Sequence, residues 1–377
     1  MRSANVYDVA TAAGVSTATI SRYFRAPEKL SAATRERVRV AVGELGYLPS
    51  GSARALAERQ TGAIGVYSFS GHEPDEVWEP SAAMTAPLPD SAGVEGGLVM
   101  RVTGGRSRPR LFPLFADEVL RGAEIECTVR RTPLVVGWQP GTGVGVELEE
   151  VARRVDGVLV LPSTIDPDAV AQLSRTKAVA LVAQPAPPDV IADAVVIDNQ
   201  GAMRALVDHL IEDHGVDSFW YAGSEAGYEH EARRRGWQSA LDAHGLRTDG
   251  PDIADAGSRA AARAVISDLL RSLLPPRAIV CASDQTALGV MEALHDAGLR
   301  VPQDVVVTGF DGIDAGEVVR PSLTTIRQPM EALGRTAVSL VVSRLAAPDT
   351  AARVVRLPVE LLLRASCGCA GEGGAAS

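Results

Sequence analysis

Residues 5–24, NVYDVATAAGVSTATISRYF, hold the pattern that decides the fold of the first part of the chain. The apolar spacing predicts a helix over residues 7–13. Gly14 follows and supplies the positive φ that a tight turn between two helices requires. Ser16 is a suitable N-cap for a second helix over residues 17–24. Two helices joined in this way predict a helix-turn-helix, whose second helix enters the major groove of DNA.

The first residues of that second helix are the ones expected to meet base edges. Thr17 and Ala18 fall there, and Arg22 follows one turn later. An arginine can donate two hydrogen bonds to a guanine, and an alanine can contact a thymine methyl group. Hydroxyl groups of the same segment can donate to phosphates, and they belong to Ser16, Thr19 and Ser21. The alternative is a helix pair that serves protein contacts.

A third helix is expected after the helix-turn-helix. Ser31 is its N-cap, Gly46 ends it, and the residues expected to face inward are Val38, Val42 and Leu45. With this helix the first part of the chain becomes a small all-α domain.

The segment that follows, residues 47–60, carries a short apolar stripe formed by Ala53, Leu56 and Ala57. This stripe is too small to make a core. The segment is therefore either a plain linker or a hinge helix. A hinge helix would pair with the copy from a partner chain and insert Leu56 between bases in the minor groove.

Charge divides the chain unevenly. Residues 1–60 hold nine Lys/Arg and five Asp/Glu, whereas the remainder holds 28 and 42. A small basic segment on an acidic body suits binding to a polyanion through that segment. The sequence has no run of about 18 apolar residues that could span a membrane, and its first residues lack the apolar core of a signal peptide. We therefore expect a cytoplasmic location.

From residue 61 onward, short apolar runs alternate with amphipathic stretches. This alternation predicts parallel sheets covered by helices on both faces, in two lobes with a ligand cleft at the carboxyl ends of the strands. The predicted strands are 63–69, 133–138, 156–162, 178–184, 194–199, 218–223, 278–283 and 305–311.

Two long stretches resemble one known family. DVATAAGVSTATISR and LSAATRERVRVAVGELGYLPSGSARAL resemble the DNA-binding head and hinge of the LacI/GalR (lactose-repressor) family of bacterial transcription regulators. AIVCASDQTALGVMEAL and GLRVPQDVVVTGFDGID are similar to that family's effector-binding core, which shares its fold with periplasmic sugar-binding proteins. The resemblance implies an all-α helix-turn-helix head and an α/β two-lobed core.

The resemblance also implies a function and a set of partners. We expect a repressor that binds a pseudo-palindromic operator as a homodimer, with Ala53 and Leu56 in the minor groove at its centre. We expect a small-molecule effector, a sugar or a related metabolite, to bind between the lobes. Effector binding would change the lobe angle and so join or separate the two hinges.

The resemblance implies four parts along the chain. They are the helix-turn-helix domain 1–47, the hinge 48–60, the core 61–366 and a flexible tail 367–377. Within the core, the expected N-lobe is 61–186 and 322–346, and the expected C-lobe is 187–321 and 347–366. The three crossovers between the lobes are expected near 185–190, 319–324 and 345–349.

Four effector-binding residues are carried over from the family. Arg233 precedes a Gly-Trp pair by three residues and is expected to donate to hydroxyls or carboxylates of the ligand. Asp311 matches the family's ligand-binding acid, and Phe115 matches an aromatic position that often lines the pocket. Ser283 stands where the family usually has an asparagine. The alternatives are a plain salt bridge between Arg233 and Asp311 and plain core packing for Phe115.

The core departs from the family in three places. Ser283 offers one hydroxyl where an amide offers both a donor and an acceptor, and the loop 253–258 has no aromatic residue to stack on a sugar. An extra segment around residues 70–110 lies beside the expected pocket mouth. Such a segment could act as a lid, contact a partner or lack order.

The helix expected from Met330 to Leu345 is a candidate dimer interface. Its apolar stripe consists of Leu333, Ala337, Leu340 and Val341. Ordinary core packing is the alternative.

Other classes of protein fit less well. The run 141–147, GTGVGVE, fails the dinucleotide motif because residue 146 is Val. The sequence also has no P-loop lysine pattern and no G-x-S-x-G elbow, so we expect no enzyme and no cofactor. A secreted solute-binding protein would share the core fold but lack the DNA-reading head. A core that contacts proteins and senses no small molecule also remains open.

No metal site is expected either. The histidines lack metal-ligand spacing, with His209 and His214 five residues apart. The pair Cys367 and Cys369 could bind a metal, but an idle reduced pair in a tail is the alternative that we favour.

Overall fold

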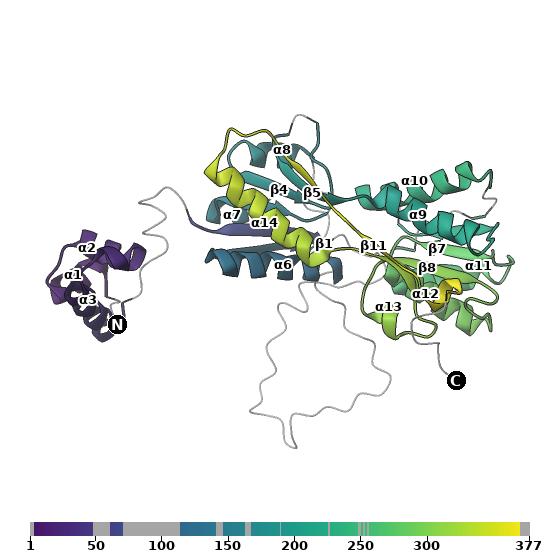
Figure 1. Cartoon of the computed structure of the whole chain (residues 1–377), viewed down its shortest axis with the longest axis horizontal. Helices are drawn as coiled ribbons and strands as arrows, with labels where there is room; N and C mark the ends of the chain where they lie inside the picture. Colours follow the sequence, from purple (N-terminus) through teal and green to yellow (C-terminus); the bar gives the residue numbers. More distant parts are fainter. Residues whose placement is uncertain are drawn as a thin grey trace, which may run out of the picture. The chain divides into compact units, whose positions relative to one another are not determined.

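The computed structural model describes residues 4–47, 61–70, 114–140, 146–162, 167–188, 190–224, 227–247, 250–251, 253–254 and 256–369. The chain forms two compact units, Met1–Gly62 and Ala63–Ser377, each described by itself (Figure 1). The expected hinge with Ala53 and Leu56, the extra segment after residue 70 and the last residues of the expected tail lie outside the described residues.

The first unit is a three-helix domain. Its elements are α1 (Val6–Ala13), α2 (Thr17–Arg25), the 3-10 turn η1 (Pro27–Lys29) and α3 (Ala32–Leu45). Asn5, Ser16 and Ser31 cap the three α-helices with their side chains. Gly14 has φ 62°, the left-handed conformation that the turn between α1 and α2 needs. The predicted helix-turn-helix and third helix are therefore confirmed.

The core of this unit is small and apolar. Its buried residues are Val9, Ala10, Ala13, Ile20, Val38 and Ala41. The prediction that Leu45 faces inward is wrong, because its side chain is 38% exposed. Leu45 is the last residue of α3, and Ala41, one turn earlier, fills the inward position.

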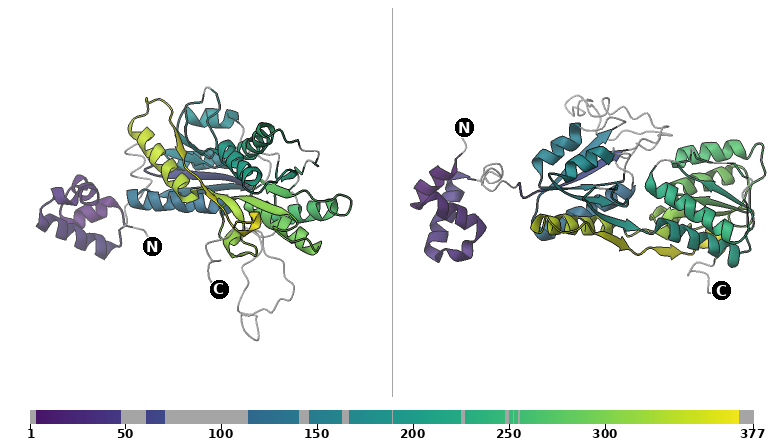
Figure 2. Two further views of the ribbon diagram at one scale, coloured as in Figure 1. Left: turned by 45° about the vertical axis from the view of Figure 1, so that its right-hand side comes forward. Right: turned by 90° about the horizontal axis from the view of Figure 1, so that it is seen from above.

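The second unit contains two sheets in two lobes (Figure 2). The first lobe has an all-parallel sheet in the order β10-β5-β4-β3-β1-β2. Its strands are β1 (Ile64–Ser70), β2 (Leu134–Pro140), β3 (Gly157–Val160), β4 (Ala178–Val182), β5 (Asp193–Ile197) and β10 (Val354–Leu357). Its helices are α6 (Leu114–Arg130), α7 (Val146–Arg154), α8 (Pro167–Ser174) and α14 (Met330–Ala346).

The second lobe has a sheet in the order β11-β9-β8-β7-β6, parallel except for the β11/β9 pair. Its strands are β6 (Phe219–Ala222), β7 (Ala278–Cys281), β8 (Val306–Asp311), β9 (Thr324–Arg327) and β11 (Glu360–Leu362). Its helices are α9 (Asn199–Glu212), α10 (Tyr228–Ala243), α11 (Arg259–Leu269), α12 (Asp284–Asp296), α13 (Ala315–Val318) and the 3-10 turn η3 (Ala365–Cys367). None of the helices within the described residues has the length and apolarity that a membrane crossing requires.

The lobe boundaries expected from the sequence are wrong, because all three crossovers lie further along the chain than expected. The chain changes lobes after β5, between β9 and α14, and between β10 and β11. Each crossing lies downstream of its expected place, because one more strand completes the sheet before the chain leaves it. Residues 367–369 are also not tail, since Cys367 is 2% exposed within the second lobe.

Helix α14 belongs to the core of the first lobe. Its stripe, Leu333, Ala337, Leu340 and Val341, is buried within the chain against α6 and strands β3–β5. The prediction that this stripe forms a dimer interface is therefore wrong, and core packing is its role. The crossing with α6 is close, because a Cβ atom at Gly122 would collide with the backbone of Glu331.

A buried ion pair joins α14 to the sheet of the first lobe. Arg344 donates to both carboxylate oxygens of Asp193 over 2.8 and 2.9 Å, and the backbone N–H of Arg353 donates to the same carboxylate over 2.8 Å. Desolvation raises the pKa of Asp193, but these hydrogen bonds outweigh it and hold the pKa below its usual value. The pair therefore fixes α14, β5 and the approach to β10 together.

Candidate functional site

The exposed face of α2 is the first candidate site. Ala18 and Arg22 are exposed, while Thr17 and Ser21 are partly buried. A shallow depression on this face is lined by Ala18, Ser21, Arg22, Ala26 and Lys29. Within the described part of the chain, the Arg22 side chain makes no hydrogen bond or ion pair, so its guanidinium is available to an external acceptor.

The hydroxyls at the start of α2 hold the helix end. Ser16 Oγ accepts a hydrogen bond from the N–H of Thr19 over 3.2 Å and lies 3.0 Å from Thr19 Oγ1. This cap leaves the remaining N–H groups of the first turn without an intrahelical partner. A helix N-terminus of this kind favours an anion such as a phosphate.

A polar group in the second lobe is the second candidate site. Arg233, in α10, is 4% exposed. Its Nε donates to Asn199 Oδ1 over 2.9 Å, and its Nη1 donates to the carbonyl of Ala282 over 2.7 Å. The guanidinium also lies over the ring of Phe310, 3.9 Å from the ring centre. Arg233 is thus held in one orientation at the carboxyl ends of the strands.

Asp311 lies beside this arginine at the end of β8. Its Oδ1 is 3.5 Å from Arg233 Nη1 and accepts a hydrogen bond from Gln328 Nε2 over 2.7 Å. The carboxylate keeps 16% exposure, so it can reach a ligand. Desolvation, together with the nearby charges of Asp284 and Glu229, raises the pKa of Asp311 to about 7 against the opposing effect of Arg233.

Several polar atoms around this pair have no partner within the described residues. Asn199 Nδ2 and Gln328 Oε1 are buried without a hydrogen bond, although the other end of each amide serves Arg233 or Asp311. His230 Nδ1 and Tyr221 OH are also unsatisfied. Buried polar groups are costly unless they are paired, so donors and acceptors are gathered here that a polar ligand could satisfy.

Ser283 and Asp284 have structural tasks beside this group. Ser283 Oγ caps α12 by accepting from the N–H of Thr286 over 3.1 Å. Asp284 is fully buried and accepts from the N–H groups of Gly312 and Ile313, both over 2.8 Å, and from the Thr325 hydroxyl over 2.6 Å. Asp284 therefore holds the loop that follows Asp311.

Phe115 is partly buried at the start of α6 and packs against the hydrophobic core, in line with the core-packing alternative. Sequence reasoning missed Asn199 and Gln328, the two amides that support Arg233 and Asp311. Asn199 ends a predicted strand, so a polar residue at a strand's carboxyl end was the available signal. Gln328 follows β9, which was not predicted.

The chain matches known proteins along nearly its whole length. The model for bacterial regulatory proteins of the lacI family matches residues 5–50, and that for the periplasmic binding protein-like domain matches residues 207–367. The chain is 29% identical over 375 residues to the HTH-type transcriptional repressor CytR of Escherichia coli strain K12, covering 96% of both sequences.

Two solved structures are similar in fold. The Lac repressor dimer bound to operator and the anti-inducer ONPF has a TM-score of 0.76 and 23% identity, covering 97% of this chain and 99% of that one. The complex of the transcriptional regulator CelR with cellobiose has a TM-score of 0.61 and 25% identity, covering 96% and 99%. These likenesses confirm the predicted fold class.

Proposed function

This chain belongs to the LacI family of bacterial regulatory proteins, and from that premise we propose that it represses transcription by binding an operator under the control of a small polar effector. The observation that carries the DNA-binding half is the exposed face of α2 with Arg22, whose side chain has no partner among the described residues. In this proposal the protein acts in the cytoplasm, where its operator DNA lies.

In this proposal each exposed residue of α2 has a task in the major groove. Thr17, Ala18 and Arg22 meet base edges, and Arg22 donates two hydrogen bonds to one guanine of each half-site. Ser16, Thr19 and Ser21 contact phosphates. A two-fold homodimer presents two such helices to a pseudo-palindrome, with Ala53 and Leu56 of both chains in the minor groove at its centre.

The effector in this proposal is a polyhydroxy compound such as a sugar or a sugar derivative. The Asp311 carboxylate would accept from a hydroxyl of the effector. Asn199 Nδ2 would donate to a neighbouring hydroxyl and Gln328 Oε1 would accept from one, since neither atom has a partner among the described residues. The structural relative CelR is described in complex with cellobiose. Because the Ser283 hydroxyl caps α12, it has less to offer the ligand than an asparagine would have.

Selection from a pool of random duplexes tests the DNA-binding half. The full-length protein is mixed with the pool at low salt, and bound DNA is recovered and sequenced over several rounds. We expect an enriched palindrome with two symmetric half-sites. Recovery of duplexes with a single half-site would contradict the dimer, and recovery without any shared sequence would contradict specific recognition.

A further inference from the structure

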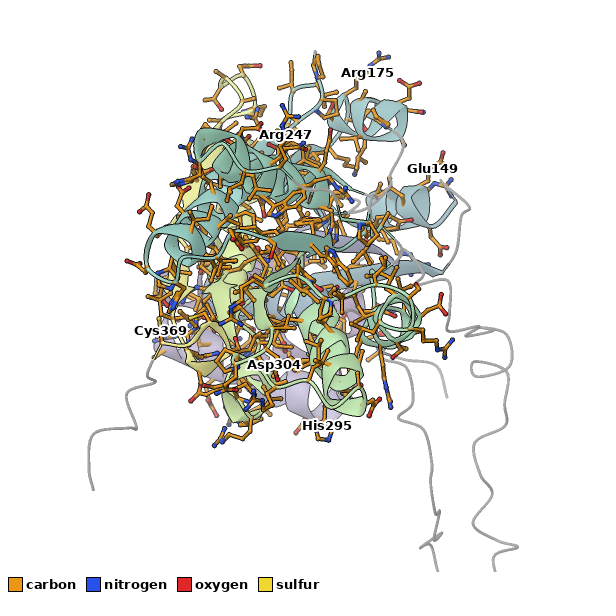
Figure 3. The ribbon with its side chains drawn as sticks, turned by 90° about the vertical axis from the view of Figure 1, so that its right-hand side faces the viewer. Glu149, Arg175, Arg247, His295, Asp304 and Cys369 are labelled. Atoms are coloured by element: carbon orange, nitrogen blue, oxygen red, sulfur yellow. The ribbon has the colours of Figure 1, made fainter. Side chains whose placement is uncertain are left out.

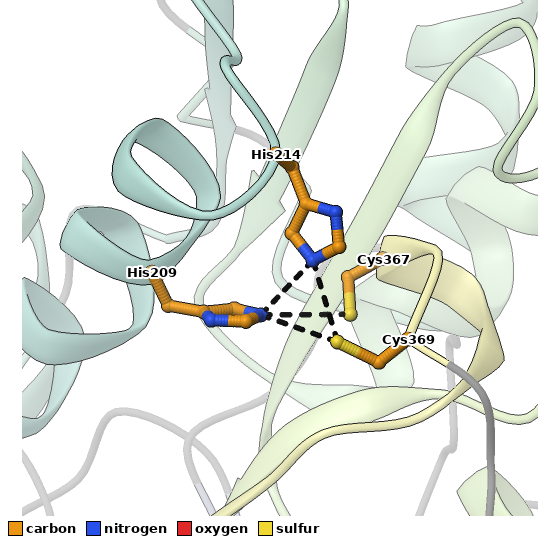
Figure 4. Close-up of side chains that lie close together, drawn as sticks. All are labelled: His209, His214, Cys367 and Cys369. Carbon is orange, nitrogen blue, oxygen red and sulfur yellow. Dashed lines mark hydrogen bonds between the residues drawn. The ribbon is translucent and has the colours of Figure 1, made fainter.

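Two segments far apart in the sequence meet at the end of α9 (Figure 4). His209 lies in the last turn of this helix, and His214 follows in the loop towards β6. Cys367 ends η3, and Cys369 follows it two residues later. One ligand atom from each of these four side chains lies within 4.8 Å of all the others.

The distances between these atoms fit a small tetrahedral centre. The two Nε2 atoms are 3.2 Å apart, and Cys369 Sγ lies 3.5 Å from His209 Nε2 and 3.3 Å from His214 Nε2. Cys367 Sγ lies 3.9 Å from His209 Nε2. Around zinc, with bonds of about 2.05 Å to nitrogen and 2.3 Å to sulfur, tetrahedral geometry separates two nitrogens by about 3.3 Å and nitrogen from sulfur by about 3.5 Å.

A second layer of contacts orients these side chains. His209 Nδ1 is 2.6 Å from the Asp213 carboxylate, which leaves Nε2 with its lone pair directed at the cluster. The Thr324 hydroxyl donates to Cys367 Sγ over 3.0 Å, as a donor that stabilises a thiolate does. The carboxylate–histidine pair is the arrangement that accompanies most histidine ligands of metals.

Hydrogen bonds among these four groups cannot all form at once. With Nδ1 of His209 donating to Asp213, its Nε2 can only accept, yet His214 Nε2 and Cys369 Sγ both lie within 3.5 Å of it. Four electron-pair donors thus converge on one small space. A cation at their centre satisfies all four at once.

We propose that His209, His214, Cys367 and Cys369 bind one Zn²⁺ ion in a closed, structural site. Two imidazoles and two thiolates are a donor set that zinc takes in tetrahedral geometry. Four protein ligands leave no open position for a substrate, so the site holds the fold together and performs no chemistry. This proposal does not depend on the DNA-binding function.

The site joins the end of the chain to the helix that supports Arg233. Asn199, at the first turn of α9, accepts from Arg233, and His209 is in the last turn of the same helix. The chain reaches η3 directly after β11, the strand that follows the third crossover. Zinc would therefore fasten the segment that follows β11 to α9 and fix that helix at the end opposite Arg233.

The test begins with the metal content of the full-length protein. It is expressed without a polyhistidine tag, purified under reducing conditions, supplied with zinc and freed of loosely held metal by gel filtration. Elemental analysis is expected to find one zinc per chain. Replacement by Co²⁺ is expected to give the visible bands of tetrahedral cobalt and a near-ultraviolet thiolate-to-cobalt band.

Variants assign the ligands. Cys369→Ala and His214→Ala alter partly exposed residues and should each remove most of the bound zinc while the circular dichroism stays native. Cys127→Ala and His295→Ala are matched controls outside the cluster and should retain one zinc; Figure 3 shows His295 well away from Cys369. Asp213→Asn should weaken zinc binding about 10- to 100-fold by removing the carboxylate that orients His209.

Three results would overturn the proposal. The first is a reduced, natively folded protein that takes up no zinc. The second is zinc that stays at one per chain in the double variant of Cys369→Ala and His214→Ala. The third is a cobalt complex that lacks the thiolate band, because it would mean that the metal sits elsewhere.

Discussion

Arg233 shows how far a single residue could be predicted from the sequence. The resemblance to the LacI family, applied at its position before the Gly-Trp pair, suggested a ligand-binding arginine. Its partners were not predictable, because Asn199 comes from another helix and Ala282 from the end of β7. These contacts depend on how α9, α10 and β7 pack, which local sequence patterns do not determine.

Asp311 should make the second lobe sensitive to pH. The pKa of Asp311 is about 7 in the folded protein and lower in the unfolded chain. At a pH between these two pKa values, the protein therefore takes up protons when it folds. Stability therefore falls as pH rises from about 4 to about 7, and at pH 8 the buried charge is a net cost. We expect Asp311→Asn to raise the free energy of unfolding by about 1–3 kcal/mol at pH 8, and by little at pH 4.

Denaturant unfolding of both proteins at the two pH values measures this difference. The same variant should also lose affinity for any effector that uses the carboxylate. An equal effect of the substitution at pH 4 and pH 8 would show that Asp311 is already ionised at low pH in the folded protein.

Arg22 should determine one base pair of each half-site. Arg22→Ala removes a bidentate hydrogen-bond donor. We therefore expect the free-energy preference for one base pair in each half-site to fall by about 1–3 kcal/mol. Binding to operators substituted at each position measures this profile.

Lys29→Ala is the matched control, because Lys29 lines the same depression and carries the same charge. It should weaken binding to all sequences alike. It should also reduce the slope of the logarithm of the binding constant against the logarithm of the salt concentration by about one. If Arg22→Ala behaved in the same way as Lys29→Ala, Arg22 would be a phosphate contact and not a base reader.

Among the secondary-structure elements, the wholly apolar strands and the capped helices were predictable, and the short strands that contain charged residues were not. All eight predicted strands are present. β9, β10 and β11 were missed because a charged residue interrupts each short run, whereas the equally short β3, β6 and β7 are apolar throughout. They form where chain segments cross between lobes, so their pairing depends on residues far away in the sequence.

The α6–α14 crossing depends on Gly122. An alanine there would push its methyl group into the backbone of Glu331, which cannot move aside as a flexible side chain would. We expect Gly122→Ala to lower the free energy of unfolding of the core by about 1–3 kcal/mol, measured by chemical denaturation.

Gly43→Ala in α3 is the control, since no atom lies within 4 Å of a Cβ added there. It should stabilise the first unit by about 0.5–1 kcal/mol, because alanine favours the helix. A Gly122→Ala protein as stable as the wild type would contradict this prediction, because it would mean that α6 and α14 can move apart without lowering the free energy of unfolding.

The Arg344–Asp193 pair should contribute more to the free energy of unfolding than any surface ion pair. Arg344→Ala leaves the Asp193 charge buried with fewer partners, so we expect the free energy of unfolding to fall by about 3–5 kcal/mol. Since the pKa of Asp193 is lowered on folding, its contribution is present above the ordinary carboxyl pKa and is lost as pH falls through the folded value. Thermal or denaturant unfolding at neutral pH measures the loss.

Arg300→Ala is the comparison, because Arg300 pairs with Asp304 on the surface. Its removal should cost less than about 1 kcal/mol. Equal losses in the two variants would indicate that water reaches Asp193 and screens it.

In the whole molecule, the features that the sequence missed are those made by distant segments. Cys369 and His209 are 160 residues apart, and the two histidines have a spacing that is not typical of a metal site on one helix. The lobe crossovers were misplaced for a similar reason, since each follows a strand that completes a sheet begun elsewhere in the chain. The division into a DNA-reading head and a two-lobed core needed only local patterns and charge.

The central claim is that ligand binding in the second unit controls DNA binding by the first. The measurement is the operator affinity of the full-length protein with and without a sugar that binds it, found from a panel by thermal shift. We predict that the sugar changes the operator Kd by about 5- to 150-fold and that Asp311→Asn abolishes this change without altering the affinity of the ligand-free protein. A sugar that binds through Asp311 and leaves the operator Kd unchanged would contradict the account.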